Sequence, residues 1–326
     1  MTSSSYVLIV STVADIATDD VIKRLTEKSV PHRRLNTEDF PFNNLFAFKP
    51  EMLNQGAWLE VNGEVLPPPT SIWYRRFRSP PIPDGMDSGI HHFCVQESRA
   101  ALLGAIVGSS ARWMSHPSAI WQSEYKPFQL SMASKVGLKI PKTIITNDPS
   151  AIRKAFIDFG EMIVKPVRTG YVSYEGEDHS IFTSQILQEH LDELESATLS
   201  PSIYQELIPK SFDIRVTIIG KRLFSAAIDS QSDPKATIDW RHTANPELPH
   251  HPITLPQEIH IKLLTLMELL GLNFAAIDLV QTPDGEYVFL EVNPNGQWLW
   301  IDDILNLGIS DAVADWLSVA EATCQN

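Results

Sequence analysis

Two apolar segments joined by a tight turn constrain the fold of this chain more than any other feature. The segments cover residues 274–280 and 286–293, and the turn between them contains Asp284-Gly285. Asp-Gly favours a two-residue type I′ turn, which places Asp278 directly opposite Glu291. Opposed acids on a hairpin have Cβ atoms roughly 5 Å apart and repel each other. The sequence therefore predicts an antiparallel hairpin whose two facing acids need a neutralising partner.

The predicted partner of these acids is a magnesium ion. Successive side chains of a strand alternate between faces, so Asn293 shares a face with Glu291. Asp278, Glu291 and Asn293 then form an all-oxygen set, which suits Mg²⁺ because this ion completes its shell with water and phosphate. The alternatives are a solvated hairpin with incidental charges, or one acid with a raised pKa. Apolar neighbours indicate burial, which favours the metal site. These neighbours are Ala276, Ile277, Leu290 and Val292.

Composition and charge exclude several classes of protein. The 326 residues are enough for two or three packed subdomains. The net charge of −14 repels nucleic acid, and no apolar stretch reaches the roughly 20 residues that span a bilayer. Residues 1–6 lack the pattern of a signal peptide, and Cys94 and Cys324 form no disulfide or metal motif. We therefore expect a cytoplasmic protein with no nucleic-acid or membrane partner.

The first part of the chain predicts a doubly wound α/β domain over residues 1–117. An apolar run at 6–10 predicts a buried strand, and a helical pattern follows it. The turn between the two contains no glycine, which excludes a dinucleotide-binding fingerprint. A later strand ends in Arg75 and Arg76, which we interpret as residues that bind an anionic ligand.

Two further domains follow in the predicted organisation. Residues 118–202 are expected to form a central lid domain, with a helix over 120–136 and a loop over 167–179. Residues 203–326 alternate strands and helices around the acidic hairpin, which predicts an antiparallel-sheet domain. The predicted fold class is therefore α/β, with α+β character in the C-terminal half.

Two lysines are placed to bind phosphate. Lys165 ends an apolar strand just before Pro166, and Lys126 lies on the helix that enters this region. Phosphate-binding lysines act as point charges from such positions, although an ordinary surface position remains the alternative for each. Another strand runs into Pro209, and its end offers the free backbone groups that an adenine edge needs.

Two arginines are candidates to stabilise negative charge. Residues 213–228 predict a second hairpin that turns at Gly220-Lys221, which places Arg215 opposite the small Ala226. Arg241 is the other candidate. Guanidinium groups match phosphoryl and carboxylate oxygens in a bidentate way. A surface salt bridge remains the alternative for either arginine.

In their order and separation these segments resemble the ATP-grasp superfamily. The matching motifs are Lys126, Val164-Lys-Pro166, Gln205-Glu-Leu-Ile208, Asp213-Ile-Arg215, Asp278-Leu-Val280 and Leu290-Glu-Val-Asn-Pro294. The resemblance covers residues 118–310 and implies an ATP-dependent ligase. It implies that Lys126 and Lys165 hold the ATP phosphates, and that Asp213 meets the ribose. The implied adenine contacts are Gln205, Glu206, Leu207 and Ile208. Asp278, Glu291 and Asn293 would bind Mg²⁺, with Arg215 and Arg241 facing the γ-phosphate and an acyl phosphate.

A finer resemblance is to the microviridin-type, or graspetide, peptide ligases. Three segments carry it, namely Trp73-Tyr-Arg-Arg76, Pro201-Ser-Ile-Tyr-Gln-Glu206 and Asn293-Pro-Asn-Gly-Gln-Trp298. The resemblance implies a ribosomally made precursor peptide, whose Asp or Glu side chains are phosphorylated and then attacked by Ser/Thr hydroxyls or a Lys amine. It implies macrolactone or macrolactam products and a homodimer. An acidic helix that contains Glu189, Asp192 and Glu193 could pair with a basic leader residue, or could simply be a solvated face.

Two other functions compete with this interpretation. A RimK-like ligase, which adds an amino acid to a protein or small acid, would share every ATP-binding residue. A nucleotide-binding regulatory protein without catalysis is the alternative from another class. Retention of the three metal-site residues together with Lys126 and Lys165 argues against it.

Overall fold

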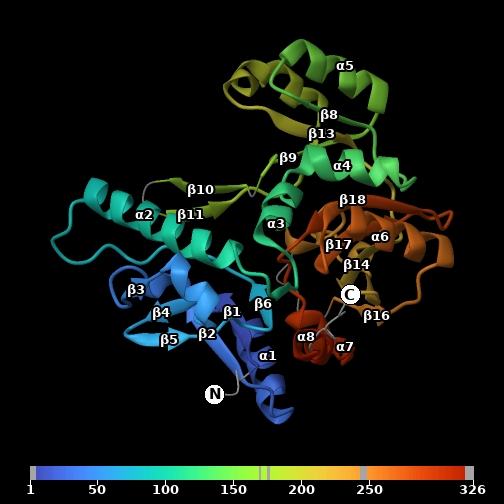
Figure 1. Cartoon of the computed structure of the whole chain (residues 1–326). Helices are drawn as coiled ribbons and strands as arrows, with labels where there is room; N and C mark the ends of the chain where they lie inside the picture. Colours follow the sequence, from blue (N-terminus) through green and yellow to red (C-terminus); the bar gives the residue numbers. More distant parts are fainter. Residues whose placement is uncertain (1–4, 169, 175–176, 243–247, 320–326) are drawn as a thin grey trace.

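The computed structural model describes residues 5–168, 170–174, 177–242 and 248–319. Its secondary structure gathers into three sheet-based units, which Figure 1 shows at the lower left, at the top and at the right. A mixed α/β fold was expected from the sequence, and the structure confirms it.

The N-terminal unit is a parallel sheet with helices on both faces. Its strand order is β2-β1-β6-β7, and residues that alternate along β1 pack to opposite sides. Leu8 and Val10 share a core with α2, whereas Val7 and Ile9 share one with α1. This confirms the doubly wound arrangement. The elements are β1 (Val7–Ser11), α1 (Ile16–Glu27), β2 (His32–Asn36), η1 (Thr37–Asp39), β3 (Phe46–Ala47), η2 (Pro50–Gln55), β4 (Leu59–Val61), β5 (Glu64–Leu66), β6 (Ser71–Tyr74), α2 (Ser88–Val107) and β7 (Arg112–Trp113).

The central unit is a four-stranded antiparallel sheet of order β12-β9-β13-β8, covered by α5 and η3. Strand β13 belongs to this sheet and extends to Glu206, beyond the predicted division at 202/203. The elements are β8 (Thr143–Thr146), α5 (Pro149–Phe159), β9 (Met162–Lys165), β12 (Ser184–Ile186), η3 (Gln188–Leu199) and β13 (Ser202–Glu206).

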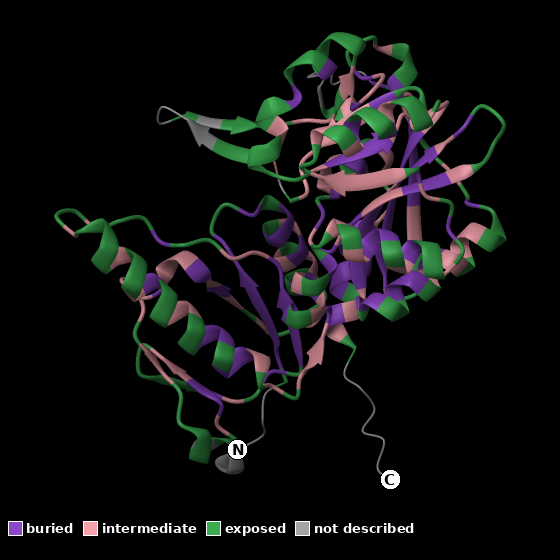
Figure 2. Ribbon diagram, turned by 90° about the horizontal axis from the view of Figure 1, so that it is seen from above, coloured by how far each residue is buried: buried purple, intermediate pink, exposed green. Residues whose placement is uncertain are grey.

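The expected loop over 167–179 is wrong for most of its length. It contains the paired strands β10 (Tyr171–Tyr174) and β11 (Glu177–Ser180), which form a hairpin that projects from the body of the molecule (Figure 2). The β-favouring Tyr and Val residues of β10 explain the strand. Residues 169 and 175–176 lie outside the described residues.

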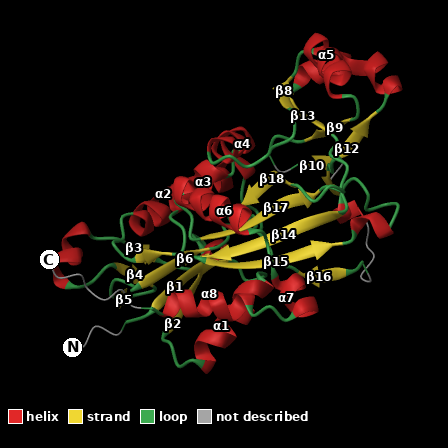
Figure 3. Cartoon of the chain, turned by 90° about the vertical axis from the view of Figure 1, so that its right-hand side faces the viewer, coloured by secondary structure: helices red, strands yellow, loops and turns green. Residues whose placement is uncertain are grey.

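The C-terminal unit is a five-stranded antiparallel sheet of order β16-β15-β14-β17-β18. Figure 3 shows the five strands in this order. Ile214, Val216 and Ile218 pack beneath α6 and α4, and Asp213, Arg215 and Thr217 lie on the opposite face, as the alternation predicts. The elements are β14 (Phe212–Ile219), β15 (Arg222–Ile228), η4 (Ser230–Ser232), η5 (Trp240–His242), β16 (His250–Pro252), α6 (Gln257–Leu270), β17 (Phe274–Gln281), β18 (Tyr287–Asn293), α7 (Leu299–Leu305) and α8 (Ile309–Ser318).

The expected helix over 120–136 is two helices, α3 (Pro117–Ser123) and α4 (Lys126–Lys135). Pro127 has no N–H to donate to the Ser123 carbonyl, so a continuous helix is broken there. The freed Ser123 carbonyl instead accepts a hydrogen bond of 2.6 Å from Gln129 Nε2. The break places Lys126 in the first turn of a new helix, next to β18.

The turn of the acidic hairpin differs from the prediction. Thr282 N donates to Glu286 O at 2.9 Å, so the loop has three residues, with Gly285 at φ 86°, rather than two. A bulge beside Asp278 shifts the register back by one residue. Asp278 therefore faces Glu291 as predicted, although the predicted turn was wrong.

The C-terminal helices connect the first and third units. Ile309, Val313 and Leu317 of these helices share a core with Val7 and Ile9 of the parallel sheet. Ser71 of β6 donates a hydrogen bond of 2.7 Å to the Leu317 carbonyl. Within the described ranges, no helix has the length and apolar character needed to cross a bilayer.

Candidate functional site

Two adjoining cavities meet at the acidic hairpin. The first, which we call the sheet cavity, lies between the central and C-terminal sheets and is lined by Lys165, Gln205 and Asp213 among others. The second, the loop cavity, lies against residues 294–297 and has a volume of about 500 Å³. The two cavities share five lining residues, so they are contiguous. The shared residues are Lys126, Arg168, Trp240, Arg241 and Asp278.

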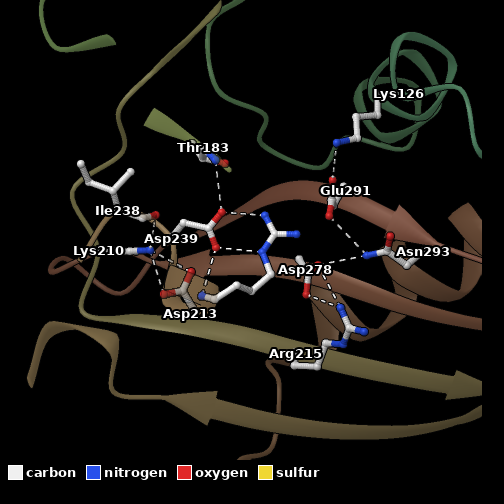
Figure 4. Close-up of polar contacts among 11 residues, drawn as sticks. Lys126, Thr183, Lys210, Asp213, Arg215, Ile238, Asp239, Asp278, Glu291 and Asn293 are labelled. Carbon is white, nitrogen blue, oxygen red and sulfur yellow. Dashed lines mark hydrogen bonds and ion pairs between the residues drawn. The ribbon is translucent and has the colours of Figure 1, made fainter. Parts of the chain in front are cut away.

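The two facing acids are each held by a cation from another element (Figure 4). Arg215 Nη1 donates to both oxygens of Asp278, at 2.8 and 3.0 Å. Lys126 Nζ lies 3.0 Å from Glu291 Oε2. Arg215 is also directly opposite Ala226, as predicted. Sequence reasoning therefore located a charged cluster that the fold does bring together.

Burial and charge move the pKa values of these acids in opposite directions. Burial raises the pKa of Asp278, although Arg215 opposes the shift. Burial also acts to raise the pKa of Glu291, but Lys126, Lys165 and Arg241 outweigh it and hold that pKa below its usual range. Asn293 lies beside both acids, and its Nδ2 donates to Asp278 at 3.1 Å and to Glu291 at 3.3 Å.

The acidic cluster could hold a metal ion only if phosphate and water supply the remaining ligands. In the described parts of the chain, no three His, Cys, Asp or Glu side chains are grouped so that they could hold a metal ion. Two carboxylates and an amide would leave open positions for phosphate and water, as Mg²⁺ prefers. The amide nitrogen of Asn293 faces the acids, so the amide group would have to be reversed to offer its oxygen.

Lys165 ends β9 and points its charge into the sheet cavity. Burial lowers the pKa of Lys165 to about 8, and nearby Glu291 opposes the shift. No carboxylate of the described residues lies within ion-pair distance of its amine. A partly buried amine without an ion-pair partner is a position where an anionic ligand would be stabilised.

The predicted adenine contacts are only partly placed on the wall of this cavity. Gln205 lines it and is fully buried, and its Nε2 donates to Thr143 at 2.9 Å while its Oε1 has no hydrogen-bond partner. Glu206, Leu207 and Ile208 are outside the lining of the sheet cavity. The backbone N–H groups of Glu206 and Leu207 already donate to Lys142 O and Glu161 O.

Three residues that sequence reasoning missed complete the site. Asp239 accepts two hydrogen bonds from the Arg241 guanidinium, at 2.8 and 2.7 Å, and Lys210 pairs with Asp213 at 2.8 Å. Arg168 lines both cavities. Asp239 thus holds Nε and Nη2 of Arg241, and Arg241 lines both cavities. A signal existed for Asp239, because it lies two residues before Arg241, whereas the roles of Lys210 and Arg168 depend on loop packing.

The two predicted ligand-binding arginines of the N-terminal unit have different environments. Arg76 is partly buried and lines the loop cavity, and burial lowers its pKa. Arg75 is fully buried, with Nε 3.3 Å from Asp15 and Nη2 donating to Gln297 at 2.8 Å. Arg75 therefore has no exposed surface for a ligand, and it holds the 294–297 loop in place instead.

The 294–297 loop connects this buried arginine to the acidic hairpin. Arg215 Nη2 donates to the Gln297 carbonyl at 2.9 Å, so Gln297 contacts both Arg75 and Arg215. A Cβ added to Gly296 would lie 2.4 Å from Ala276 Cβ and 3.0 Å from Arg215 Nη2. Only glycine fits at this position, because any Cβ would overlap Ala276 and press against Arg215.

The predicted leader-binding acids lie apart from these cavities. Glu189, Asp192 and Glu193 are exposed on η3. None of them forms an ion pair with a described residue. Their carboxylates are therefore accessible to solvent.

Comparisons with known proteins cover 96% of the chain. Residues 6–120 match the family model of the MvdD pre-ATP grasp domain. The fold is similar to macrocyclase MdnC of Microcystis aeruginosa, bound with precursor peptide MdnA, with 31% identity, a TM-score of 0.84, and coverage of 96% of this chain and 99% of that one. It is also similar to a Chryseobacterium gregarium RiPP-associated ATP-grasp ligase in complex with ADP and a leader and core peptide, with 26% identity, a TM-score of 0.86 and 96% coverage of both chains.

A more distant similarity involves part of the chain. Human N-acetylaspartylglutamate synthase A is 28% identical over 120 residues, which is 36% of this chain. The match spans only 29% of the length of that curated relative.

Proposed function

This chain belongs to the family of RiPP-associated ATP-grasp ligases, and we propose that it closes rings in a ribosomally made precursor peptide. In this proposal, Asp or Glu side chains of the peptide are activated by ATP and joined to Ser/Thr hydroxyls or a Lys amine. The observation that carries the proposal is the junction of two cavities, where Lys126, Arg215 and Arg241 surround a pair of acids.

The sheet cavity is the proposed site of ATP. The unpartnered Oε1 of Gln205 can accept a hydrogen bond from the amino group of adenine. Such a bond would remove the free-energy cost of a buried acceptor without a partner. Asp213 would contact the ribose. The cationic amines of Lys126 and Lys165 would bind the phosphates. Glu206, Leu207 and Ile208 remain candidates for the adenine edge through backbone carbonyls, since two of their N–H groups are occupied.

The acidic hairpin is the proposed magnesium site, held by Asp278, Glu291 and Asn293. When bound there, Mg²⁺ would neutralise the negative charge that develops on the transferring phosphoryl group. The cations that now pair with the two acids show how strongly this position favours positive charge.

The loop cavity is the proposed site of the reacting carboxylate. A carboxylate oxygen attacks the γ-phosphorus of ATP, which forms an acyl phosphate and releases ADP. A hydroxyl or amine then attacks the acyl carbon, gives up its proton and displaces phosphate. Arg215 and Arg241 would stabilise the negative charge of both steps, and Arg76 would help to hold the incoming carboxylate.

The remaining parts of the proposal concern recognition and assembly. Glu189, Asp192 and Glu193 would pair with a basic residue of the leader. We also propose a cytoplasmic homodimer. Size-exclusion chromatography with light scattering tests the dimer, and a monomeric mass at micromolar concentration would contradict it.

The direct test combines the purified protein, ATP, Mg²⁺ and a candidate precursor peptide, sought among short reading frames beside the gene that are rich in Ser/Thr and Asp/Glu. We expect peptide-stimulated ADP release and a peptide mass reduced by one water for each ring. Tandem mass spectrometry would assign each ring to an acid and a hydroxyl or amine. Absence of peptide-stimulated ADP release, from folded protein and an intact precursor, would refute the proposal.

An amino-acid ligase of the RimK type is the second candidate, because N-acetylaspartylglutamate synthase A matches part of the chain. Such an enzyme would add the mass of an amino acid to its acceptor, whereas ring closure removes water. A regulatory protein without catalysis would bind ATP but would release no ADP with any acceptor.

A further inference from the structure

A third cavity adjoins the loop cavity beneath the N-terminal unit. We call it the arginine cavity, and its volume is about 810 Å³. The end of β6, the middle of α2, the end of α3 and the segment after β9 surround it. It shares four lining residues with the loop cavity, so a ligand can extend from one into the other. The shared residues are Arg76, Glu124, Arg168 and Asn295.

The lining of the arginine cavity is positive although the whole chain carries a net charge of −14. Arg75, which is paired with Asp15, lines it together with three further arginines, Arg76, Arg99 and Arg168. Glu124 is the one acid among the described lining residues. None of these three arginines has an ion pair with a carboxylate of the residues that the structure describes. Arg76 and Arg99 are partly buried and Arg168 is exposed, and the carboxylate of Glu124 is a nearby counter-charge that all three share. The surplus of positive charge around one space favours an anionic ligand.

Aromatic rings hold the cavity in shape. The Arg99 guanidinium lies over the Phe77 ring, 4.5 Å from its centroid, and Trp121 meets Tyr74 edge-on with a centroid distance of 6.3 Å. A guanidinium stacked on a ring keeps the N–H groups at its edge free for a carboxylate. Arg99 is thus oriented by its own neighbours, without using its hydrogen-bond donors.

We propose that the arginine cavity binds a second carboxylate of the precursor peptide, next to the one that reacts. This inference rests on the proposed function. A peptide advances at most about 3.3–3.6 Å per residue, so acids a few residues apart can occupy two adjoining cavities at once. The second carboxylate would fix which acid of a cluster enters the loop cavity, which makes Arg99 a specificity-determining residue.

The test compares two precursor peptides and two arginine variants. One peptide keeps all its acids, and the other keeps a single reactive acid with its neighbours changed to Gln or Asn. Arg99→Gln removes one charge from the cavity, and Arg78→Gln is the matched control, since Arg78 is an exposed arginine of the loop after β6 and lies outside the lining.

For Arg99→Gln, the KM of peptide-dependent ADP release should rise about tenfold with the acid-rich peptide, as loss of one charge-assisted contact predicts. The KM for the single-acid peptide should stay unchanged, which also reports an intact fold. Arg99→Lys should restore part of the affinity. An equal effect on both peptides, or an effect on neither, would overturn the inference. If the unaltered protein releases no ADP with either peptide, the proposed function itself fails, and this result is distinct.

Discussion

At the scale of single residues, the lowered pKa of Lys165 predicts that nucleotide binding is coupled to proton uptake. Burial lowers the pKa of Lys165 to about 8 in the free protein, whereas phosphate bound beside it would restore the protonated form. Below this pKa the amine is already protonated, so nucleotide binding takes up no proton there. Above it the free amine is neutral, so binding takes up a proton and ADP affinity falls as the pH rises.

Calorimetry of ADP binding at about pH 9, in buffers of different ionisation enthalpy, measures this proton uptake. The uptake should disappear in Lys165→Met. Lys154→Met is the control, because Lys154 is exposed on α5 and outside the sheet cavity. Unchanged uptake in Lys165→Met would show that another group titrates.

A second prediction at this scale concerns Asp239, which orients Arg241 through two hydrogen bonds. Asp239→Asn keeps the shape but loses the ion pair, so Arg241 is no longer fixed. We expect kcat for the acid-activating step to fall about 100-fold, the order that displacement of a reacting group by about 1 Å can cost. The affinity for ADP should change little. Arg241 also lines the loop cavity, which explains a larger effect on kcat than on nucleotide binding.

Single-turnover ADP formation and equilibrium ADP titration separate these two effects. Asp303→Asn serves as the control, since Asp303 is exposed on α7 and lies outside the lining of both cavities. A parallel loss of kcat and ADP affinity would contradict the assigned role of Asp239.

At the scale of elements, the facing pairs of the acidic hairpin were predictable from the sequence, whereas its turn and its bulge were not. Alternation and pairing rules placed Asp278 opposite Glu291 and Arg215 opposite Ala226, because these rules are local. The three-residue turn and the bulge were not predictable in the same way. At the bulged strand, Val292 N donates to Gln129 Oε1 at 2.9 Å and its carbonyl accepts from Gln129 Nε2 at 2.8 Å, across 163 positions of sequence. Such long-range contacts select the irregular register.

The position of the 294–297 loop likewise depends on contacts that are distant in the sequence, and this dependence can be tested. Its position depends on Arg75, a buried arginine paired with Asp15, and its Gln297 carbonyl accepts a hydrogen bond from Arg215. In the sequence, Arg75 is a basic residue that follows a strand, which predicts a ligand-binding role. Its burial between two units cannot be recognised from the sequence. The loop therefore couples the N-terminal unit to the acidic hairpin.

Asp15→Asn should destabilise the protein by about 3–5 kcal/mol, since it leaves a buried charge without its partner. Urea unfolding measures the change. Asp15→Asn combined with Arg75→Met should lose less than the sum of the two single losses. Glu64→Gln breaks the exposed pair with Arg33 and should leave the unfolding midpoint nearly unchanged. Additive losses would indicate that Arg75 and Asp15 do not act as a pair.

At the scale of the whole molecule, the shared core makes the N-terminal unit dependent on the end of the chain. Helix α8 packs with α1 and β6 on one side and β14 on another, and its residue Leu317 is 1% exposed. The N-terminal sheet thus has one face covered by residues more than 200 positions away. The division predicted at residue 117 separates sequence segments that fold around a common core.

Leu317→Ala tests this dependence. Loss of a buried leucine should cost about 2–5 kcal/mol. The N-terminal and C-terminal units should still unfold in one transition, because they share a core. Unfolding in urea is followed by tryptophan fluorescence and by far-UV circular dichroism. Ile304→Ala is the matched control, since Ile304 is 51% exposed on α7 and its loss should change the midpoint little. Two separate transitions, with only the first shifted by Leu317→Ala, would show that the N-terminal unit unfolds independently and that α8 does not couple it to the C-terminal sheet.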